Sequence, residues 1–416
     1  MIKSDHYLVL DTNIVLEQID VLESEGINNV IILHTVLNEV KHRSSPVYKR
    51  LKDIIADKNR HFFVFVNEHM KETYIERQEG ESANDRNDRA IRVACSWYKS
   101  NLKSKVDVVM ISDDNRNREL AIEEGLKSFK LIDYVKEMKD YPELLDKVNR
   151  GDKDSSKNKN KNILFPEHLS QSQITAGIKS GKLKQGVFYL SRTNFLEGTV
   201  NIEGREPVLL HGLESMNRAV DGDTVAVEVL EEKDWTAPAE VVLIDEGFDP
   251  GDTLEKDNKK LKEAVKSKDV QCTGKVVGII RRKWRQYCGM LQPNPNKGAT
   301  KHLFVAAEKK IPKVRIETRQ ADILANQRII VAIDCWPRTS RYPTGHFVRA
   351  LGKLGDKATE NQVLLLEHDI PHSSFSEAVL ECLPQMPWSI TPRDEAVRVD
   401  CRHIDICSVD PPGDYR

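Results

Sequence analysis

The stretch Tyr7-Leu8-Val9-Leu10-Asp11-Thr12-Asn13 decides the fold of the first third of the chain, because an apolar strand-like run ends directly on an acid. The same pattern returns at Val108-Val109-Met110-Ile111-Ser112-Asp113-Asp114. Further strand-like runs cover residues 30–33 and 62–66, and a helical apolar stripe runs through residues 84–102. This alternation of strands and helices predicts an α/β fold with a parallel sheet covered by helices.

Four acids are candidates for a site at one edge of this sheet. Asp11 and Asp114 follow two different strands, and ligands of open α/β sheets bind outside the carboxyl ends of the strands. Glu39 follows the mostly apolar run 30–37. Asp88 lies about 60° from the centre of the helical stripe, whereas Asp85 lies about 120° away, so we prefer Asp88 as the inward carboxylate.

Carboxylates that converge without basic partners repel one another and raise each other's pKa. A divalent cation relieves this repulsion, and oxygen-only ligands favour Mg²⁺ or Mn²⁺ over zinc. Such a cation activates water and neutralises charge on a reacting phosphate. The alternative is that each acid is an ordinary surface group or a helix cap.

Length and composition bound the remaining possibilities. The chain has 416 residues, 39% of them apolar and 31% charged, which predicts several globular domains. No run of about 18 apolar residues occurs, so no membrane span is expected, and the N-terminus lacks the apolar core of a secretion signal. The seven cysteines are widely spaced without a CxxC pair, which predicts free thiols rather than disulfides or a zinc knuckle.

After a polar Lys- and Asn-rich segment, the pattern changes to short β-rich runs punctuated by glycine, which predicts two small β-barrels. The expected organisation is an α/β domain at 1–147, a linker at 148–162, a first barrel at 163–245, a charged linker at 246–270, a second barrel at 271–355 and a C-terminal segment at 356–416.

Residues 271–355 carry 17 Lys and Arg against 4 Asp and Glu, a net charge of +13 in a chain whose total is −2. A local excess of this kind is typical of a surface that binds a polyanion. Barrels that bind single-stranded nucleic acid combine a cationic groove with aromatic side chains on which bases stack. The residues expected to contact a nucleic-acid strand are Arg281, Lys283, Trp284, Arg285, Tyr287, Phe304, Arg341 and Phe347. The alternative is a barrel with an aromatic core and a basic surface that serves solubility.

Four blocks of the first domain resemble the acidic motifs of PIN nuclease domains. They are Leu10-Asp11-Thr12-Asn13, Leu37-Asn38-Glu39-Val40, Asn84-Asp85-Arg86-Asn87-Asp88-Arg89-Ala90 and Ser112-Asp113-Asp114-Asn115-Arg116-Asn117. The resemblance implies that Asp11, Glu39, Asp88 and Asp114 are the catalytic, metal-binding acids of an RNA endonuclease that uses Mn²⁺ or Mg²⁺. The motif spacing to Asn117 favours Asp114 over Asp113.

The segments Pro46-Val47-Tyr48-Lys49-Arg50 and Asn67-Glu68-His69, with Tyr74, are similar to the Dis-three type ribonucleases of the RNA exosome. This resemblance covers essentially the whole chain and implies a PIN domain followed by two cold-shock (OB-type) barrels. It implies single-stranded RNA and exosome core subunits as partners, the latter through the PIN domain. It also implies a location in the nucleus (nucleolus and nucleoplasm) and cytoplasm.

The final run, Cys407-Ser408-Val409-Asp410-Pro411-Pro412-Gly413, resembles the opening of the exonuclease (RNB) active-site motif of the same family. Only Asp410 matches an acid of that site, so residues 356–416 are interpreted as the truncated beginning of the exonuclease domain. We therefore expect no processive 3′→5′ exonuclease activity from this chain. A rival hypothesis is a non-catalytic scaffold that docks on the exosome and holds RNA.

Overall fold

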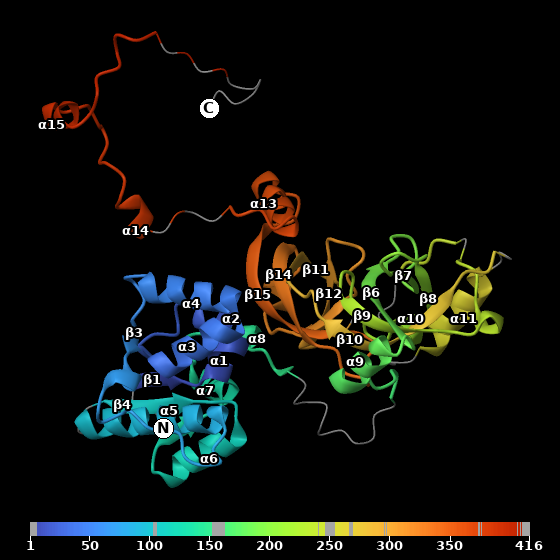
Figure 1. Ribbon diagram of the computed structural model, residues 1–416, viewed down its shortest axis with the longest axis horizontal. Helices are drawn as coiled ribbons and strands as arrows, with labels where there is room; N and C mark the ends of the chain where they lie inside the picture. The colour runs from blue at the N-terminus through green and yellow to red at the C-terminus, as the bar shows by residue number, and fades with distance from the viewer. Residues whose placement is uncertain are drawn as a thin grey trace. The chain divides into compact units, whose positions relative to one another are not determined.

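The computed structural model describes residues 6–102, 106–151, 163–239, 241–245, 254–265, 269–294, 296, 298–372, 375, 377–405, 407 and 409. The chain divides into two compact units, Met1–Pro371 and His372–Arg416, each of which is described by itself. The larger unit contains an α/β domain and two closed β-barrels (Figure 1), so the predicted fold class is confirmed. Most of the expected linker, residues 152–162, lies outside the described residues.

The N-terminal domain is built on a five-stranded sheet of order β3-β2-β1-β4-β5 in which every neighbouring pair is parallel. Its strands are β1 (His6–Leu10), β2 (Val30–Leu33), β3 (Phe62–Phe65), β4 (Asp107–Ile111) and β5 (Lys127–Phe129). All four residues of β2 are buried, as expected for a central strand with both faces covered. Sequence reasoning found the first four strands but missed β5, because its Lys-Ser-Phe sequence is too short and too polar to stand out.

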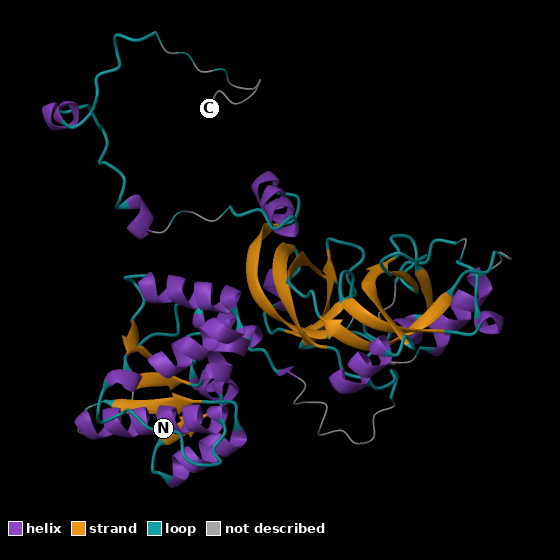
Figure 2. Cartoon of the chain, viewed as in Figure 1, coloured by secondary structure: helices purple, strands orange, loops and turns teal. Residues whose placement is uncertain are grey.

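Helices pack around this sheet (Figure 2) and carry two of the four candidate acids. They are α1 (Thr12–Glu17), α2 (Ile19–Leu22), α3 (His34–Arg43), α4 (Ser45–Ala56), α5 (Ala83–Asn101), α6 (Asn115–Glu123), α7 (Leu131–Glu137) and α8 (Leu144–Lys147), with the short 3-10 helix η1 (Asn67–His69). The Ser82 hydroxyl caps the start of α5 by accepting from the backbone N–H of Asp85. Ile91 and Cys95 of the predicted stripe are buried, so α5 turns this face toward the sheet.

The first barrel has the closed strand order β10-β8-β7-β6-β9. Its elements are α9 (Gln171–Lys179), β6 (Leu183–Leu190), β7 (Glu197–Asn201), β8 (Val208–His211), α10 (Leu213–Met216), β9 (Thr224–Val229), η3 (Glu232–Asp234), α11 (Glu255–Ala264) and β10 (Thr273–Arg281). We expected residues 271–281 to open the second barrel, and this boundary is wrong. β10 pairs with β8 and β9 and closes the first barrel, because completing the ring satisfies two sheet edges that would otherwise be open.

The second barrel has the closed order β11-β12-β13-β15-β14. Its elements are β11 (Gln286–Leu291), β12 (Lys301–Ala306), β13 (Val314–Glu317), α12 (Ala321–Leu324), β14 (Gln327–Cys335), β15 (Thr344–Lys353) and α13 (Lys357–Glu367). A Cβ at Gly289 would lie 2.1 Å from the carbonyl oxygen of Val305, so only glycine permits this approach of two strands.

The helix α13 also belongs to the second barrel, which moves the expected boundary at residue 356 toward residue 371. The Glu367 carboxylate accepts from the backbone N–H of Cys288 at 3.0 Å, and Glu360 pairs with Arg328 at 2.9 Å. Sequence reasoning separated this helix from the barrel because its partners lie far away along the chain.

The second unit contains α14 (Glu377–Leu380) and α15 (Pro392–Ala396). Among its described residues no hydrophobic side chain is buried. Within the described part of the chain, none of the helices combines the length and the apolar character needed to traverse a bilayer. None of the seven cysteines, all of which are described, forms a disulfide, as expected.

Candidate functional site

Two of the four candidate acids lie at the carboxyl ends of neighbouring strands. β1 and β4 pair in parallel with Leu10 opposite Ile111, and the backbone N–H of Asp11 donates to the Ile111 carbonyl at 3.0 Å. Asp11 occupies the N-cap of α1 without using its carboxylate as a cap. Asp114 occupies the N-cap of α6 and does cap it, accepting from the Asn117 backbone N–H at 3.0 Å. The strand ends therefore bring these two carboxylates to one edge of the sheet.

The other two acids come from helices. Glu39 lies on α3, where its Oε2 accepts from the Thr12 hydroxyl at 3.0 Å and from the Asn87 side-chain amide at 3.1 Å. Asp88 directly follows Asn87 on α5. Asp85 instead accepts from the Ser82 hydroxyl at 2.6 Å, at the start of the helix. This geometry supports the choice of Asp88 over Asp85.

Electrostatic coupling joins the four carboxylates into one cluster. Burial, together with the charges of Asp11, Asp114 and Glu39, raises the pKa of Asp88 to about 7 against the opposing charge of Arg92. Burial also raises the pKa of Asp11, with a smaller contribution from Asp114. Acids that raise one another's pKa in this way form one electrostatically coupled cluster.

Neutral donors and one paired cation support Asp11. The Ser112 hydroxyl donates to Asp11 Oδ2, and the Asn117 side-chain amide approaches the same oxygen at 3.4 Å. Arg92 donates to Asn117 Oδ1 at 2.7 Å and pairs with Glu124 at 2.9 Å. Arg92 is thus paired with Glu124 rather than with an acid of the cluster, so its charge offsets only part of the repulsion at Asp88 and the cluster keeps a negative excess.

The cluster consists of oxygen donors only, which suits Mg²⁺ or Mn²⁺ in kind. Within the residues that the structure describes, however, no three His, Cys, Asp or Glu side chains are already close enough to hold one metal ion. A cation would have to draw the carboxylates together from the positions in which Ser112, Asn117, Thr12 and Asn87 now hold them.

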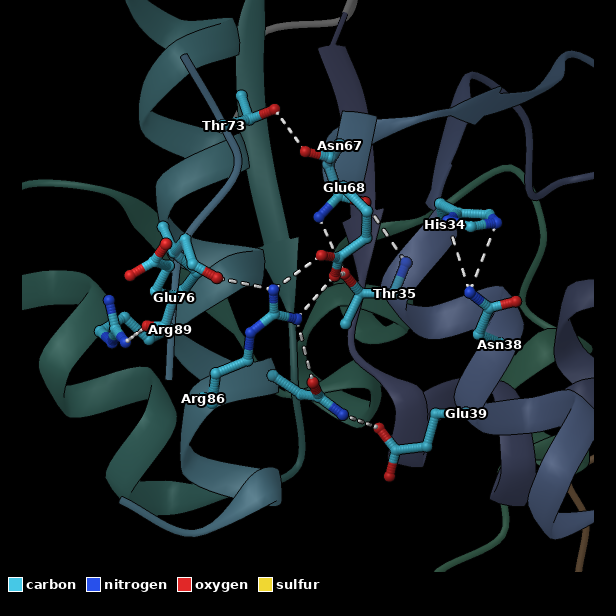
Figure 3. A network of polar contacts seen from close by, with 12 residues as sticks. His34, Thr35, Asn38, Glu39, Asn67, Glu68, Thr73, Glu76, Arg86 and Arg89 are labelled. Carbon is cyan, nitrogen blue, oxygen red and sulfur yellow. Dashed lines mark hydrogen bonds and ion pairs between the residues drawn. The ribbon is translucent and has the colours of Figure 1, made fainter. Parts of the chain in front are cut away.

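Sequence reasoning missed the residues that orient Glu39. Glu39 accepts from the side-chain amide of Asn87, whose oxygen accepts from Arg86. Arg86 in turn forms an ion pair with Glu68 (Figure 3). Asn87 and Arg86 both lie inside the quoted acidic block, but nothing in the sequence pairs them with Glu39 or Glu68, which come from other elements.

The aromatic residues expected to stack on RNA bases are core residues instead. Tyr287, Phe304 and Phe347 are buried together in the second barrel, with 1%, 0% and 6% of their surface exposed. Trp284 is half-buried against the same core, and the Arg282 guanidinium lies 4.5 Å from its ring centre. A base cannot stack on a ring face that is already covered, so the alternative of an aromatic core fits these side chains.

Much of the basic excess is neutralised by acids from outside residues 271–355. Arg285 pairs with Glu367 at 2.6 Å. Arg341, which is buried, donates to Asp245 at 3.1 Å and to Asp257 at 3.2 Å. Other pairs of this kind are Arg282–Asp223, Lys310–Asp221, Lys275–Glu228, Arg328–Glu360 and Arg338–Glu167.

Two of the expected RNA contacts remain accessible. Arg281 ends β10 and Lys283 lies in the connection between the barrels, and both side chains are exposed. Residues 282–285 belong to no strand, so this connection between the barrels is irregular. The remaining predicted residue, Asp410, lies outside the described residues.

Comparison with known families identifies three domains along the chain. A PIN domain matches residues 8–132, an Rrp44-like cold shock domain matches residues 162–263, and a Dis3-like cold-shock domain 2 (CSD2) matches residues 301–369. These matches follow the order of the α/β domain and the two barrels.

Curated relatives show the same similarity over nearly the whole chain. "Exosome complex exonuclease RRP44" of Homo sapiens is 53% identical over 419 residues, covering 98% of this chain and 44% of that protein. "Exosome complex exonuclease RRP44 homolog A" of Arabidopsis thaliana is 41% identical, covering 99% and 47%. "Exosome complex exonuclease dis3" of Schizosaccharomyces pombe is 40% identical, covering 98% and 44%. The chain thus spans less than half the length of these relatives.

Proposed function

This chain belongs with the RRP44 (Dis3) exosome nucleases, as a homologue of their N-terminal part, and we propose that its PIN domain is a metal-dependent endonuclease of single-stranded RNA. The observation that carries the proposal is the coupled acid cluster at the sheet edge, in which the pKa of Asp88 rises to about 7. A cluster with this negative excess has a strong affinity for a divalent cation.

Each acid has a role that follows from its position. Asp11, Asp88 and Asp114 hold the cation, and Glu39 serves as a further ligand or as the base for the attacking water. A bound Mn²⁺ or Mg²⁺ supplies positive charge at the scissile phosphate and eases deprotonation of water. Ser112 and Asn117 orient Asp11 for this purpose, since both donate to its Oδ2.

The two barrels hold the RNA strand, with Arg281 and Lys283 as accessible contacts to phosphate. The relatives are named as exosome complex exonucleases, and we extend this association to the chain by proposing that its PIN domain docks on exosome core subunits. The same association supports a location in both nucleus and cytoplasm.

Circular single-stranded RNA tests the endonuclease directly, because a circle has no end for an exonuclease. We expect cleavage with Mn²⁺ or Mg²⁺ and none with EDTA. Asp88→Asn should lower the rate by at least about 100-fold, since loss of a ligand should cost more than loss of a supporting contact. Asp85→Asn, on the same helix, should cleave normally. Wild-type cleavage rates in Asp88→Asn would remove the assignment.

A non-catalytic scaffold is the second candidate, in which the hydrogen bonds that Asp11, Glu39 and Asp114 accept from protein donors serve the fold rather than a cation. In this case the α/β domain docks the chain and the barrels hold RNA without cleavage. Calorimetric titration with Mn²⁺ distinguishes the two: no binding at millimolar metal favours the scaffold, whereas binding that Asp88→Asn abolishes favours the nuclease.

A further inference from the structure

The helix α3 presents two polar side chains one turn apart on one face. Thr35 and Glu39 are four residues apart, and this spacing places both on the side of α3 that meets α5 and η1. Each of them is bound by a different polar group of the neighbouring segments (Figure 3).

The Thr35 position is fixed by η1. The buried Asn67 side chain accepts from the Thr35 backbone N–H at 3.3 Å and donates to the Thr35 hydroxyl at 2.8 Å. The Thr35 hydroxyl in turn donates to the Glu68 carboxylate. The Thr73 hydroxyl holds the Asn67 carbonyl at 2.9 Å, so this end of the network is anchored in the buried backbone.

Arg86 joins η1 to α5 through a two-point ion pair. Its two terminal nitrogens donate to the two oxygens of Glu68, each at 2.6 Å, and one also donates to the Ile75 carbonyl at 2.7 Å. The two side chains are only 16% and 18% exposed, so solvent screens this pair much less than it screens a surface pair.

Asn87 extends the network to the acid cluster. An Arg86 N–H approaches Asn87 Oδ1 at 3.5 Å, which turns the amide nitrogen of Asn87 toward Glu39, where it donates at 3.1 Å. The Arg86 guanidinium beside Oδ1 makes the opposite orientation of the Asn87 amide unfavourable, because the amide N–H groups would then face the positive charge.

Glu39 needs the Asn87 donor because two other interactions favour a position of its carboxylate farther from the acid cluster. Its charge is repelled by Asp88, and Arg43, which is half-exposed, offers a partner for its other oxygen at 3.2 Å on the solvent side. Without Asn87, the Glu39 carboxylate would be left with the hydrogen bond from Thr12 on one side and the ion pair with Arg43 on the other.

We propose that Arg86, held by Glu68, and Asn87 are positioning residues that set the spacing of α3 and α5 and so keep Glu39 in the acid cluster ready for a cation. This inference rests on the proposed function, because it assumes that the cluster binds metal. The inference gives a role in metal binding to the Arg86–Glu68 ion pair, which is assigned no contact with the cation or the RNA.

The test measures Mn²⁺ affinity by calorimetry on the full chain carrying Arg86→Lys or Asn87→Ala. Lysine keeps the charge but cannot bind both oxygens of Glu68 and Asn87 together. We expect each variant to weaken Mn²⁺ binding by about 10- to 100-fold, the range for contacts that orient metal ligands. Raising the Mn²⁺ concentration should restore cleavage of circular RNA, with the KM for RNA unchanged.

Arg89→Lys is the matched control. Arg89 lies on the same helix and also forms an ion pair, with Glu81 at 2.8 Å, and donates to the Glu76 carbonyl at 2.8 Å, but it makes no contact with Glu39 (Figure 3). Its Mn²⁺ affinity should stay within about twofold of wild type, because the Arg89–Glu81 pair is comparably covered but does not connect to Glu39.

The outcomes separate this inference from the proposed function. If the wild-type protein binds no Mn²⁺, both the proposed function and this inference are contradicted. Wild type that binds Mn²⁺, together with Arg86→Lys and Asn87→Ala that bind it equally well, overturns the inference alone. An equal loss in Arg89→Lys would assign the effect to general weakening of α5 and also overturn it. If Arg86→Lys fails to fold, Asn87→Ala still decides, because it leaves the ion pair intact.

Discussion

The acid cluster of the PIN domain and the basic block of the second barrel are both concentrations of one charge, but the fold treats them in opposite ways. Asp11 and Glu39 are held mainly by neutral donors such as Ser112 and Asn87, and the pKa of Asp88 rises to about 7. The basic side chains instead find acidic partners from elsewhere in the chain, as Arg285 does in Glu367. Charge left uncompensated in the folded state, rather than charge density along the sequence, is therefore the feature on which the proposed site rests.

Removing a compensated charge should have the largest effect on stability. Arg341 is buried with Asp245 and Asp257 as its partners, so Arg341→Met leaves two acids without their cation. We expect the free energy of unfolding to fall by about 3–5 kcal/mol, measured by chemical denaturation. The exposed Arg281→Met should change it by about 0.5 kcal/mol or less. Equal effects of the two substitutions would contradict the contrast between paired and free cations.

The pH dependence of His346 tests compensation in the second barrel by one acid of the same barrel, Asp334, and one acid of the α/β domain, Asp20. Burial alone would lower the pKa of His346, but hydrogen bonds and charges from Asp20 at 3.1 Å and Asp334 at 2.6 Å raise it to about 9. A raised pKa contributes stability that is complete below the unfolded value of about 6.5 and is lost as the pH rises through 9.

We therefore expect the free energy of unfolding to fall by about 1–3 kcal/mol between pH 6.5 and 9. His346→Gln cannot be charged, so its unfolding curve should be flatter over this range. A wild-type curve with no slope that depends on His346 would show that the two aspartates do not hold a proton on this ring.

In metal-free protein, a raised pKa at Asp88 should affect the free energy of unfolding in the opposite way to a charged partner: it should destabilise the fold. Its pKa is raised from 3.8 to about 7, so the unfolded chain loses its proton first and stability falls as the pH rises from about 4 to 7. In EDTA at pH 8, Asp88→Asn should be more stable than wild type by about 1 kcal/mol, a figure reduced because the carboxylate is partly exposed. Asp85→Asn is the control. An equal gain in stability from Asp85→Asn would contradict the proposal that Asp11, Asp114 and Glu39 repel Asp88 in particular.

The smallest expected effect concerns the cations that the fold leaves exposed. Arg281→Ala combined with Lys283→Ala should weaken single-stranded RNA binding a few-fold without changing stability. Each lost phosphate contact should reduce the slope of log affinity against log salt by about 0.7. Lys233→Ala, another exposed lysine, should leave the slope unchanged. If the double variant also keeps the wild-type slope, these two residues do not contact phosphate.

The sheet of the PIN domain could be predicted because its information is local. Asp11 and Asp114 each follow an apolar run, and parallel strands bring such positions together without knowledge of distant contacts. The helical stripe through Ile91 and Cys95 likewise indicated which face of α5 is buried and hence that Asp88 is the inward acid.

The errors arose where the deciding partner is distant. β10 closes the first barrel by pairing with strands that lie before a long charged stretch. The alternation of residues along a strand distinguishes two faces, but it cannot tell a barrel interior from an RNA-binding surface, so Phe304 and Tyr287 were misassigned. The ion pair between Glu68 and Arg86 joins two elements and left no periodic signal.

The place of β10 has a practical consequence for dissecting the chain into parts. A recombinant first barrel cut at residue 245 would lack the strand Thr273–Arg281 and would present the open edges of β8 and β9 to other molecules. Open edges of this kind recruit further chains and lead to aggregation. A fragment that continues through residue 281 keeps its ring intact, and the four-residue connection 282–285 is then the natural point of division.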